Sequence, residues 1–287
     1  MKKRIDPKIG QLVKTIKDNK KLTLKQMTGG KFSESMLTRL EKGENSISVE
    51  KFFTILSNSQ IFLDEFQHLY NDYEATDDLG FQREMAIAYA RKDIKKLKSL
   101  VQLWEVSAEV EETNKFIRIN RLVSRAVLAL AQKSKPLVED VRFLADYLDS
   151  VDDWGRYELW IFGNCLYFFD KSSLQHYGEI ILNKTKFYKS LHINQQMVIR
   201  MLLNLVDAWL RYNELWQARK YLNHVKEVGI SIDFFYERIL LVYHEAHYRF
   251  LQGNESGKEE MRECANTIER YGFAAESEIL FVEIENL

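Results

Sequence analysis

Only two prolines occur in this chain of 287 residues, and glycine is also scarce, with 12 residues. These are the two residue types that most often interrupt helices, so long helical stretches can run almost unbroken. The hydrophobic content of 46% is sufficient for a large core, in one large or two ordinary domains. The sequence therefore predicts an all-α protein.

Most of the chain repeats one plan, in which two apolar helices flank a short polar break. The breaks lie near Asp93, Ser134, Asp170, Asn213 and Gly253, at successive spacings of 41, 36, 43 and 40 residues. One such unit cannot bury its own apolar stripe, whereas stacked units can. We expect a right-handed α-solenoid of the tetratricopeptide type with a concave inner surface, although its spacing exceeds the usual repeat of about 34 residues. An irregular helical bundle is the alternative.

Charge divides the chain into a basic head and an acidic body. Residues 1–50 hold 12 Lys and Arg against 6 Asp and Glu, while the remainder holds 29 against 36. A positive head predicts contact with a polyanion such as DNA, unless the bias only serves solubility. We place the head at 1–66, a linker at 67–80 and the repeat domain at 81–287.

The head carries the start and stop signals of four short helices. Thr23 and Gln26 have the spacing of a capping box, and Gly29 suits the left-handed end of a short helix. Ser33 and Ser48 are placed to cap the next two helices. A short helix, a tight turn and a helix with small polar residues predict a helix-turn-helix DNA-binding domain.

Small polar side chains and one arginine on the predicted recognition helix fit the major groove of DNA. The candidate groove-facing residues are Ser33, Ser35, Met36, Thr38 and Arg39, although Met36 also fits the inward pattern with Leu37 and Leu40. Lysines outside this helix would contact phosphates and contribute affinity without sequence choice. They are Lys14, Lys17, Lys25 and Lys31. The alternative is a generic four-helix cap that does not read DNA.

Polar side chains on the first helices of the repeats suggest a peptide groove. Asn164, Asn204 and Tyr236 are candidates, because amides imitate the edge of a strand to an extended peptide. Arg238 is a candidate for a carboxylate. Each asparagine could instead be a satisfied core amide, and Arg238 could simply pair with Glu237.

The sequence predicts neither an enzyme nor a cofactor or metal site. His244 and His247 are three residues apart, not the four of a zinc-binding H-E-x-x-H helix. Cys165 and Cys264 lie in apolar helical patterns and are expected as buried free thiols. No secretory signal and no apolar run of about 18 residues is present, so we expect a cytoplasmic protein that does not span a membrane.

Several stretches resemble the Rgg family of regulators. They are GGKFSESMLTRLEKGENSISVEKFF in the head, and YELWIFGNCLYFF, FYKSLHINQQMVIRMLLNLVDAWL and DFFYERILLVYHEAHYRFLQG in the body. The resemblance implies a homodimeric cytoplasmic transcription regulator that binds double-stranded promoter DNA and receives a short, hydrophobic, re-imported signalling peptide in the repeat domain. It also implies that Asn164, Asn204, Tyr236 and Arg238 line the peptide pocket, with Arg156 in the same inner region.

The chain departs from that family at two places in the head. Lys14 and Lys17 stand where the family often has arginines, and lysine contacts phosphate as a point charge rather than a fork. Asn45 stands where some members have a cysteine that can link the dimer. A function from another class also fits the residues, namely a helical-repeat protein–protein scaffold or inhibitor whose head serves dimerisation rather than DNA reading.

Overall fold

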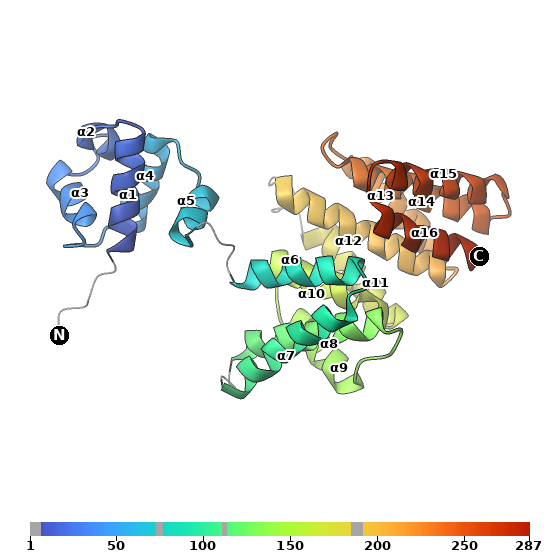
Figure 1. The fold of residues 1–287 in the computed structure, drawn as a ribbon. Coiled ribbons are helices and arrows are strands. Elements are labelled where there is room, and N and C mark those ends of the chain that lie inside the picture. Colours follow the sequence, from blue (N-terminus) through green and yellow to red (C-terminus); the bar gives the residue numbers. More distant parts are fainter. Residues whose placement is uncertain (1–6, 73–76, 111–113, 185–191) are drawn as a thin grey trace. The chain divides into compact units, whose positions relative to one another are not determined.

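The computed structural model describes residues 7–72, 77–110, 114–184 and 192–287 (Figure 1). Its regular elements are α-helices and one 3-10 turn, and the described ranges contain no strand. The chain divides into two compact units, Met1–Glu84 and Met85–Leu287. The prediction of an all-α protein is confirmed.

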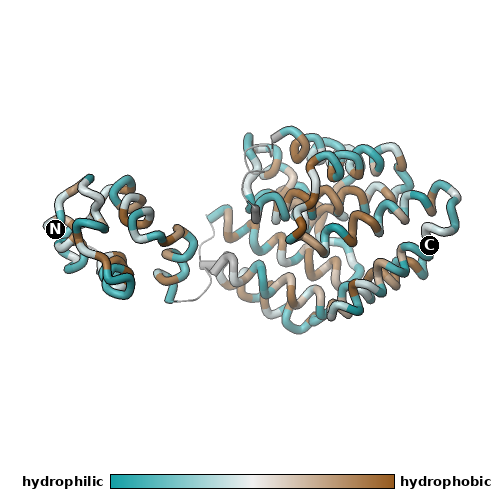
Figure 2. The backbone as a smooth tube through the Cα atoms, turned by 90° about the horizontal axis from the view of Figure 1, so that it is seen from above, coloured by the Kyte–Doolittle hydropathy of each residue, from teal (hydrophilic) through white to brown (hydrophobic). Residues whose placement is uncertain are grey.

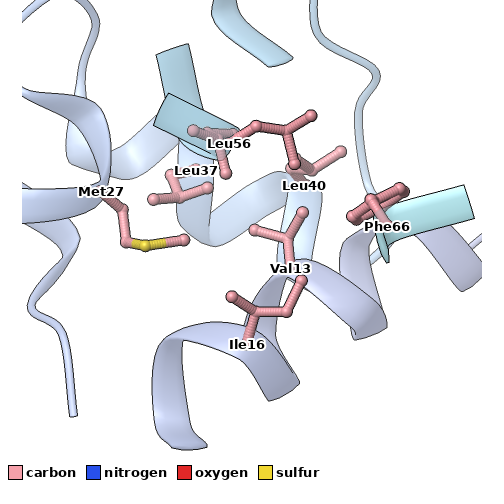
Figure 3. Packing of buried hydrophobic residues seen from close by; sticks show 8 residues of the cluster. Val13, Ile16, Met27, Leu37, Leu40, Leu56 and Phe66 are labelled. Atoms are coloured by element: carbon pink, nitrogen blue, oxygen red, sulfur yellow. The ribbon is translucent and has the colours of Figure 1, made fainter. Parts of the chain in front are cut away.

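Five helices share the core of the first unit, and the boundary between the units falls within the next helix, α6 (Asp77–Ala90). The five helices are α1 (Lys8–Asn19), α2 (Leu24–Thr28), α3 (Glu34–Glu41), α4 (Val49–Ser59) and α5 (Leu63–Tyr70). Their apolar faces meet in one core, whose buried members are Val13, Ile16, Met27, Leu37, Leu40, Ile55, Leu56 and Phe66 (Figure 3). Each of the five helices contributes at least one of these side chains, so the core fixes how they pack.

The predicted signals at the ends of α2 and α3 are present. Thr23 and Gln26 form the reciprocal capping box, and the Ser33 hydroxyl accepts a hydrogen bond from the Met36 amide. Gly29 ends α2 with φ +57°. The prediction for Ser48 is only partly right, because Ser48 precedes α4 but its side chain makes no capping hydrogen bond. The turn between α2 and α3 is therefore fixed by local chemistry.

A close crossing brings α1 against α3. A Cβ atom added at Gly10 would lie 1.9 Å from the Leu40 carbonyl oxygen, so only glycine permits this approach. Lys17 of α1 also pairs with Glu41 at the end of α3. The helix that would read DNA is thus held against α1 at two points.

Helices enter the predicted linker at 67–80 from both sides. Helix α5 continues to Tyr70, and Leu69 and Tyr70 pack against the core of the first unit. The next helix, α6, already begins at Asp77. The predicted linker at 67–80 therefore includes residues that belong to helices at both of its ends.

The second unit consists of paired helices and a final helix. The helices are α6 (Asp77–Ala90), α7 (Ile94–Val110), α8 (Lys115–Ala131), α9 (Val138–Asp149), α10 (Arg156–Cys165), the 3-10 turn η1 (Leu166–Phe168), α11 (Lys171–Lys184), α12 (His192–Arg211), α13 (Leu215–Val228), α14 (Phe235–Leu251), α15 (Ser256–Arg270) and α16 (Ala274–Glu285). Apolar and polar segments alternate along these helices, as expected when one face is buried (Figure 2).

All five predicted breaks fall between the two helices of a pair. Four of the turns are closed by a residue with positive φ: Lys92, Lys133, Asn213 and Gly253. The first helices of successive pairs pack on one another, α8 on α10, α10 on α12 and α12 on α14. This arrangement confirms the stacked helix pairs of a tetratricopeptide-like domain.

Small residues permit the closest helix contacts inside the pairs. Ala218 of α13 is fully buried. A Cβ atom at Gly257 of α15 would lie 2.4 Å from the Ala246 carbonyl oxygen of α14. The first helices are therefore held by their partners, which leaves their other faces to line a cavity.

Candidate functional site

The candidate recognition helix α3 presents the side chains that were expected to face DNA. Ser33, Ser35 and Arg39 are exposed, and the Arg39 side chain is 62% exposed. Met36 and Thr38 are half-buried. Leu37 and Leu40 are buried on the opposite side and anchor the helix in the core. The geometry thus leaves one face of α3 free for a partner.

The lysines predicted to contact phosphates do not all have the same surroundings. Lys14, Lys25 and Lys31 are exposed. Lys17 is different, because its side chain is only 14% exposed and its Nζ lies 2.8 Å from Glu41 Oε1. The expectation that Lys17 lies on the solvent side is wrong. Its partner 24 residues later draws it inward, where it joins α1 to α3.

A cavity of about 990 Å³ opens on the first helices of the second unit. Its lining comes from α6, α8, α10, the 3-10 turn η1, α12, α14 and α16. The lining residues that bear on function are Asn164, Tyr167, Asn204, Arg211, Tyr236, His247 and Glu283. This volume lies at the upper end of the range of roughly 300–1,000 Å³ that small-ligand sites occupy. The predicted inner surface is therefore hollow.

Three predicted pocket residues meet at this cavity, each from a different helix. Asn164 comes from α10, Asn204 from α12 and Tyr236 from α14. The Asn164 amide already donates to the Trp160 carbonyl at 2.7 Å. Asn204 is half-buried and has no hydrogen bond to any described residue, so its whole amide is available to a ligand.

Arg238 does not line the cavity. Successive residues of a helix are rotated by about 100°, so Arg238 points about 200° away from Tyr236 and the two cannot face one groove. Arg238 instead donates to the Ile230 carbonyl at 3.1 Å, outside the cavity. The expected pair with Glu237 is also absent, because the buried Glu237 carboxylate pairs with Arg200 at 2.5 Å. Arg238 is therefore not one of the residues that line this cavity.

Arg156 also lies outside the cavity lining. It stands at the first position of α10, and its Nε donates to the Asn194 side chain of α12 at 2.6 Å. Its side chain is exposed. Arg156 therefore joins two inner helices near their amino ends rather than contributing to the cavity described above.

A polar cluster that was not predicted from the sequence lies beside the cavity. The Asp207 carboxylate accepts hydrogen bonds from Tyr167 and from Arg211, the latter at 2.8 Å. Glu283 of α16 lies 3.4 Å from Arg211 and accepts a hydrogen bond from Tyr243 at 3.0 Å. The cluster joins α12, α14 and α16, three of the helices that line the cavity.

Burial changes the ionisation of this cluster. Burial and the neighbouring Asp207 raise the pKa of Glu283 to about 7, against the opposing charge of Arg211. Although burial opposes it, the Arg211 guanidinium holds the pKa of Asp207 below its ordinary value. Burial and the nearby His244 lower the pKa of His247 to about 4. The histidine is therefore neutral at pH 7, and Glu283 holds part of a proton.

The signal for half of this cluster was present in the sequence. Asp207 and Arg211 stand one helical turn apart in the otherwise apolar stretch LLNLVDAWLR, and opposite charges at that spacing pair on a helix. Glu283 gave no such signal, because only the fold brings α16 to α12.

Other predicted features can be located as well. Cys165 and Cys264 are free and buried, and burial raises the pKa of Cys165 to about 12 and of Cys264 to about 11. In the described ranges, no group of three or more His, Cys, Asp or Glu side chains could hold a metal ion. Within the same ranges, no helix is long and apolar enough to span a bilayer.

These features define a class of protein that joins a helix-turn-helix unit to a tetratricopeptide-like unit with a ligand-sized cavity. Residues 67–275 match the C-terminal domain of the helix-turn-helix transcriptional regulator Rgg. The match covers most of the chain, and this protein belongs to the Rgg family of transcriptional regulators.

Solved structures share the fold over nearly the whole chain. A putative transcriptional regulator from Listeria monocytogenes aligns with a TM-score of 0.80 and 22% identity, covering 97% of this chain and 96% of that one. The SHP pheromone receptor Rgg2 from Streptococcus dysgalactiae gives 0.76 and 21%, covering 97% and 99%. PrgX in complex with cCF10 gives 0.68 and 17%, covering 97% and 99%. At these identities the likeness establishes the fold.

Proposed function

We propose that this protein is a homodimeric transcription regulator that binds promoter DNA through α3 and is controlled by a short hydrophobic peptide bound in the cavity of the second unit. The observation that carries the proposal is the cavity itself, which is lined by the first helices of the repeats in a chain that also bears a helix-turn-helix unit.

The chemistry of the cavity suits an extended peptide. Asn204 offers a donor and an acceptor to a peptide backbone, and Tyr236 and Tyr167 add aromatic surface with a polar tip. Apolar side chains of α8 and α16, such as Leu130 and Val282, provide the contacts that a hydrophobic peptide needs. Two structural relatives are described as pheromone receptors or peptide complexes, which is consistent with such a ligand.

The DNA side of the proposal rests on the exposed face of α3. Ser33 and Ser35 are small enough to enter a major groove, and Arg39 can reach a guanine or a phosphate. Lys14, Lys25 and Lys31 are exposed and would contact the phosphates. Two such heads in a dimer would bind half-sites about one helical turn apart.

A peptide can change DNA binding only if it prefers one of two states of the regulator. We propose that α16 takes part in the preference for one of these states, since Glu283 joins α16 to Arg211 and Tyr243. A ligand that occupies the cavity would alter this polar cluster and so change the relative stability of the two states.

The decisive experiment measures DNA and peptide binding with the full chain. Fluorescence anisotropy with the promoter region upstream of this gene should show specific binding that Arg39→Ala weakens without changing the circular dichroism spectrum. Synthetic peptides encoded by small open reading frames beside the gene are then added one at a time. At least one should raise the melting temperature of the protein and change its affinity for the promoter.

The same measurement separates the proposal from the alternative of a protein–protein scaffold. If the wild-type chain binds no DNA even at low salt while it captures a protein partner, the head serves dimerisation and the proposal is wrong. If it binds DNA but none of the peptides, the cavity takes another class of ligand.

A further inference from the structure

Arg200 stands on the same stripe of α12 as two residues that line the cavity. At about 100° per residue, Arg200 lies within about 40° of Asn204 and about 20° of Arg211 around the helix axis. Both of those residues line the cavity; Arg200 is not part of that lining, but it stands on the same stripe of α12, one turn before Asn204.

A buried carboxylate holds the Arg200 side chain in place. Its Nε lies 2.5 Å from Glu237 Oε1, and the Glu237 side chain is 1% exposed. The same oxygen accepts a hydrogen bond from Gln196 at 3.0 Å. Because burial and the bond from Gln196 hold Glu237 independently of Arg200, the carboxylate orients the guanidinium.

The outer edge of this guanidinium is open. The Arg200 side chain is 50% exposed, and among the described residues no acceptor takes a hydrogen bond from its terminal nitrogens. Tyr236 of the cavity is close enough for the Arg200 charge to oppose the rise that burial causes in the pKa of its phenol. Two parallel N–H donors on the stripe of α12 that also carries Asn204 match the geometry of a carboxylate.

We propose that Arg200 is the residue that reads a carboxylate of the peptide ligand, the role that the sequence had suggested for Arg238. This inference rests on the proposed peptide-binding function and adds the chemistry of one end of the ligand. The carboxylate is either the peptide's own carboxyl terminus or an acidic side chain. Binding it would leave the bond to Glu237 intact, since the two use different edges of the guanidinium.

The test uses the full chain and three pools of synthetic N-acetylated heptapeptides, built from Ile, Leu, Val, Phe, Ala and Thr. The first pool ends in a free carboxylate, the second in an amide, and the third in an amide with one aspartate in the sequence. Protein-bound peptides are separated by size exclusion and quantified by mass spectrometry. Arg238→Gln is the matched control, because Arg238 is an exposed arginine outside the cavity.

The wild-type chain should retain the carboxylate pool at least tenfold better than the plain amide pool. Arg200→Gln should remove that preference, and Arg238→Gln should keep it. Because Arg200→Gln leaves Glu237 buried without its partner, a variant that also carries Glu237→Gln tests the same preference with a neutral pair. Equal retention of the aspartate pool and the carboxylate pool would assign an acidic side chain as the ligand group.

Two results would overturn the inference: equal retention of the carboxylate and plain amide pools by the wild type, or an unchanged preference in both Arg200 variants. In either case peptides are still bound, so the proposed function stands without this residue. Retention of no pool by the wild type would contradict the proposed peptide ligand itself.

Discussion

Lys17 of α1 and Glu41 of α3 form an ion pair across the first unit, with 2.8 Å between Nζ and Oε1 and with 14% and 8% of their side chains exposed. The pair joins the helix that would read DNA to the helix that begins the unit. A lysine so placed holds α3 in position instead of contacting the nucleic acid.

Lys14 and Lys17 should therefore differ when each is changed to alanine. Lys14→Ala should weaken DNA binding for all sequences alike and reduce the slope of log affinity against log salt by about 1, because one phosphate contact is lost. Lys17→Ala should leave that slope unchanged and lower the free energy of unfolding by about 1–3 kcal/mol. Anisotropy titrations between 50 and 200 mM salt and urea unfolding measure the two effects. A slope reduced equally by Lys17→Ala would contradict the structural role.

Gly29 should tolerate alanine much less well than its neighbour Gly30. Both have positive φ, +57° and +72°, but a Cβ atom at Gly29 would lie 2.6 Å from Asn58 Nδ2, whereas nothing lies within 4 Å at Gly30. Asn58 donates to the Met27 carbonyl and so ties α4 to α2. Gly30→Ala should cost about 1 kcal/mol, and Gly29→Ala about 1–2 kcal/mol more. Hydrogen exchange of the α2 and α4 amides measures this difference, and equal protection in the two variants would contradict it.

Asn204 should matter more for peptide binding than Asn164. The Asn204 amide has no partner among the described residues, whereas Asn164 already donates to Trp160. Asn204→Ala should raise the dissociation constant of a bound peptide about tenfold, as expected for the loss of about 1.4 kcal/mol, with little change in melting temperature. Asn223→Ala, an exposed asparagine of α13 outside the cavity, is the control. Unchanged peptide affinity in the Asn204 variant would place the ligand elsewhere.

Glu283 should make the wild-type protein lose stability as the pH rises toward neutral. The pKa of Glu283 is raised from 4.5 to about 7, so the folded state keeps a proton that the unfolded state releases. The stabilisation is complete below pH 4.5 and is lost by pH 7. As the pH rises over that interval, the free energy of unfolding of Glu283→Gln should therefore increase by up to about 3 kcal/mol relative to that of the wild type.

Urea unfolding of both proteins at pH 5, 6, 7 and 8 tests this effect. His247 acts in the opposite direction, because its pKa is lowered from 6.5 to about 4 and its contribution is lost as the pH falls. That contribution is common to the two proteins and largely cancels in the comparison. A stability difference that does not change with pH would show that Glu283 has an ordinary pKa.

Local chemistry explains which parts of the fold could be predicted. The capping box at Thr23 and the cap at Ser33 depend on residues at most three positions away, and both were confirmed. The repeat breaks could be predicted because polar residues interrupt apolar helices, and each break lies between the two helices of one pair. Asn164, Asn204 and Tyr236 were found at the cavity because each first helix has one dominant inward face.

Pairing across the fold explains what could not be predicted. From the sequence alone, Lys17 is expected to be exposed, because only the fold places Glu41 of α3 beside it. Glu283 is likewise expected to be an ordinary acidic residue, because only the fold places α16 against Arg211. Arg238 is a different case, because its angle from Tyr236 on one helix already excludes a shared groove without the fold. Only the fold places Glu237 of α14 beside Arg200 of α12, the contact on which the proposed role of Arg200 rests.

Both native thiols are buried, so they would not react with a thiol-labelling reagent. Cys165 and Cys264 are buried with raised pKa values, so neither offers a thiolate to a maleimide at neutral pH. A cysteine introduced at an exposed head position such as Lys31 and another at Asn223 would then be the reactive pair. Spin labels or fluorophores at those two sites would report how the separation of the units responds to a peptide, in a protein whose core has not been altered.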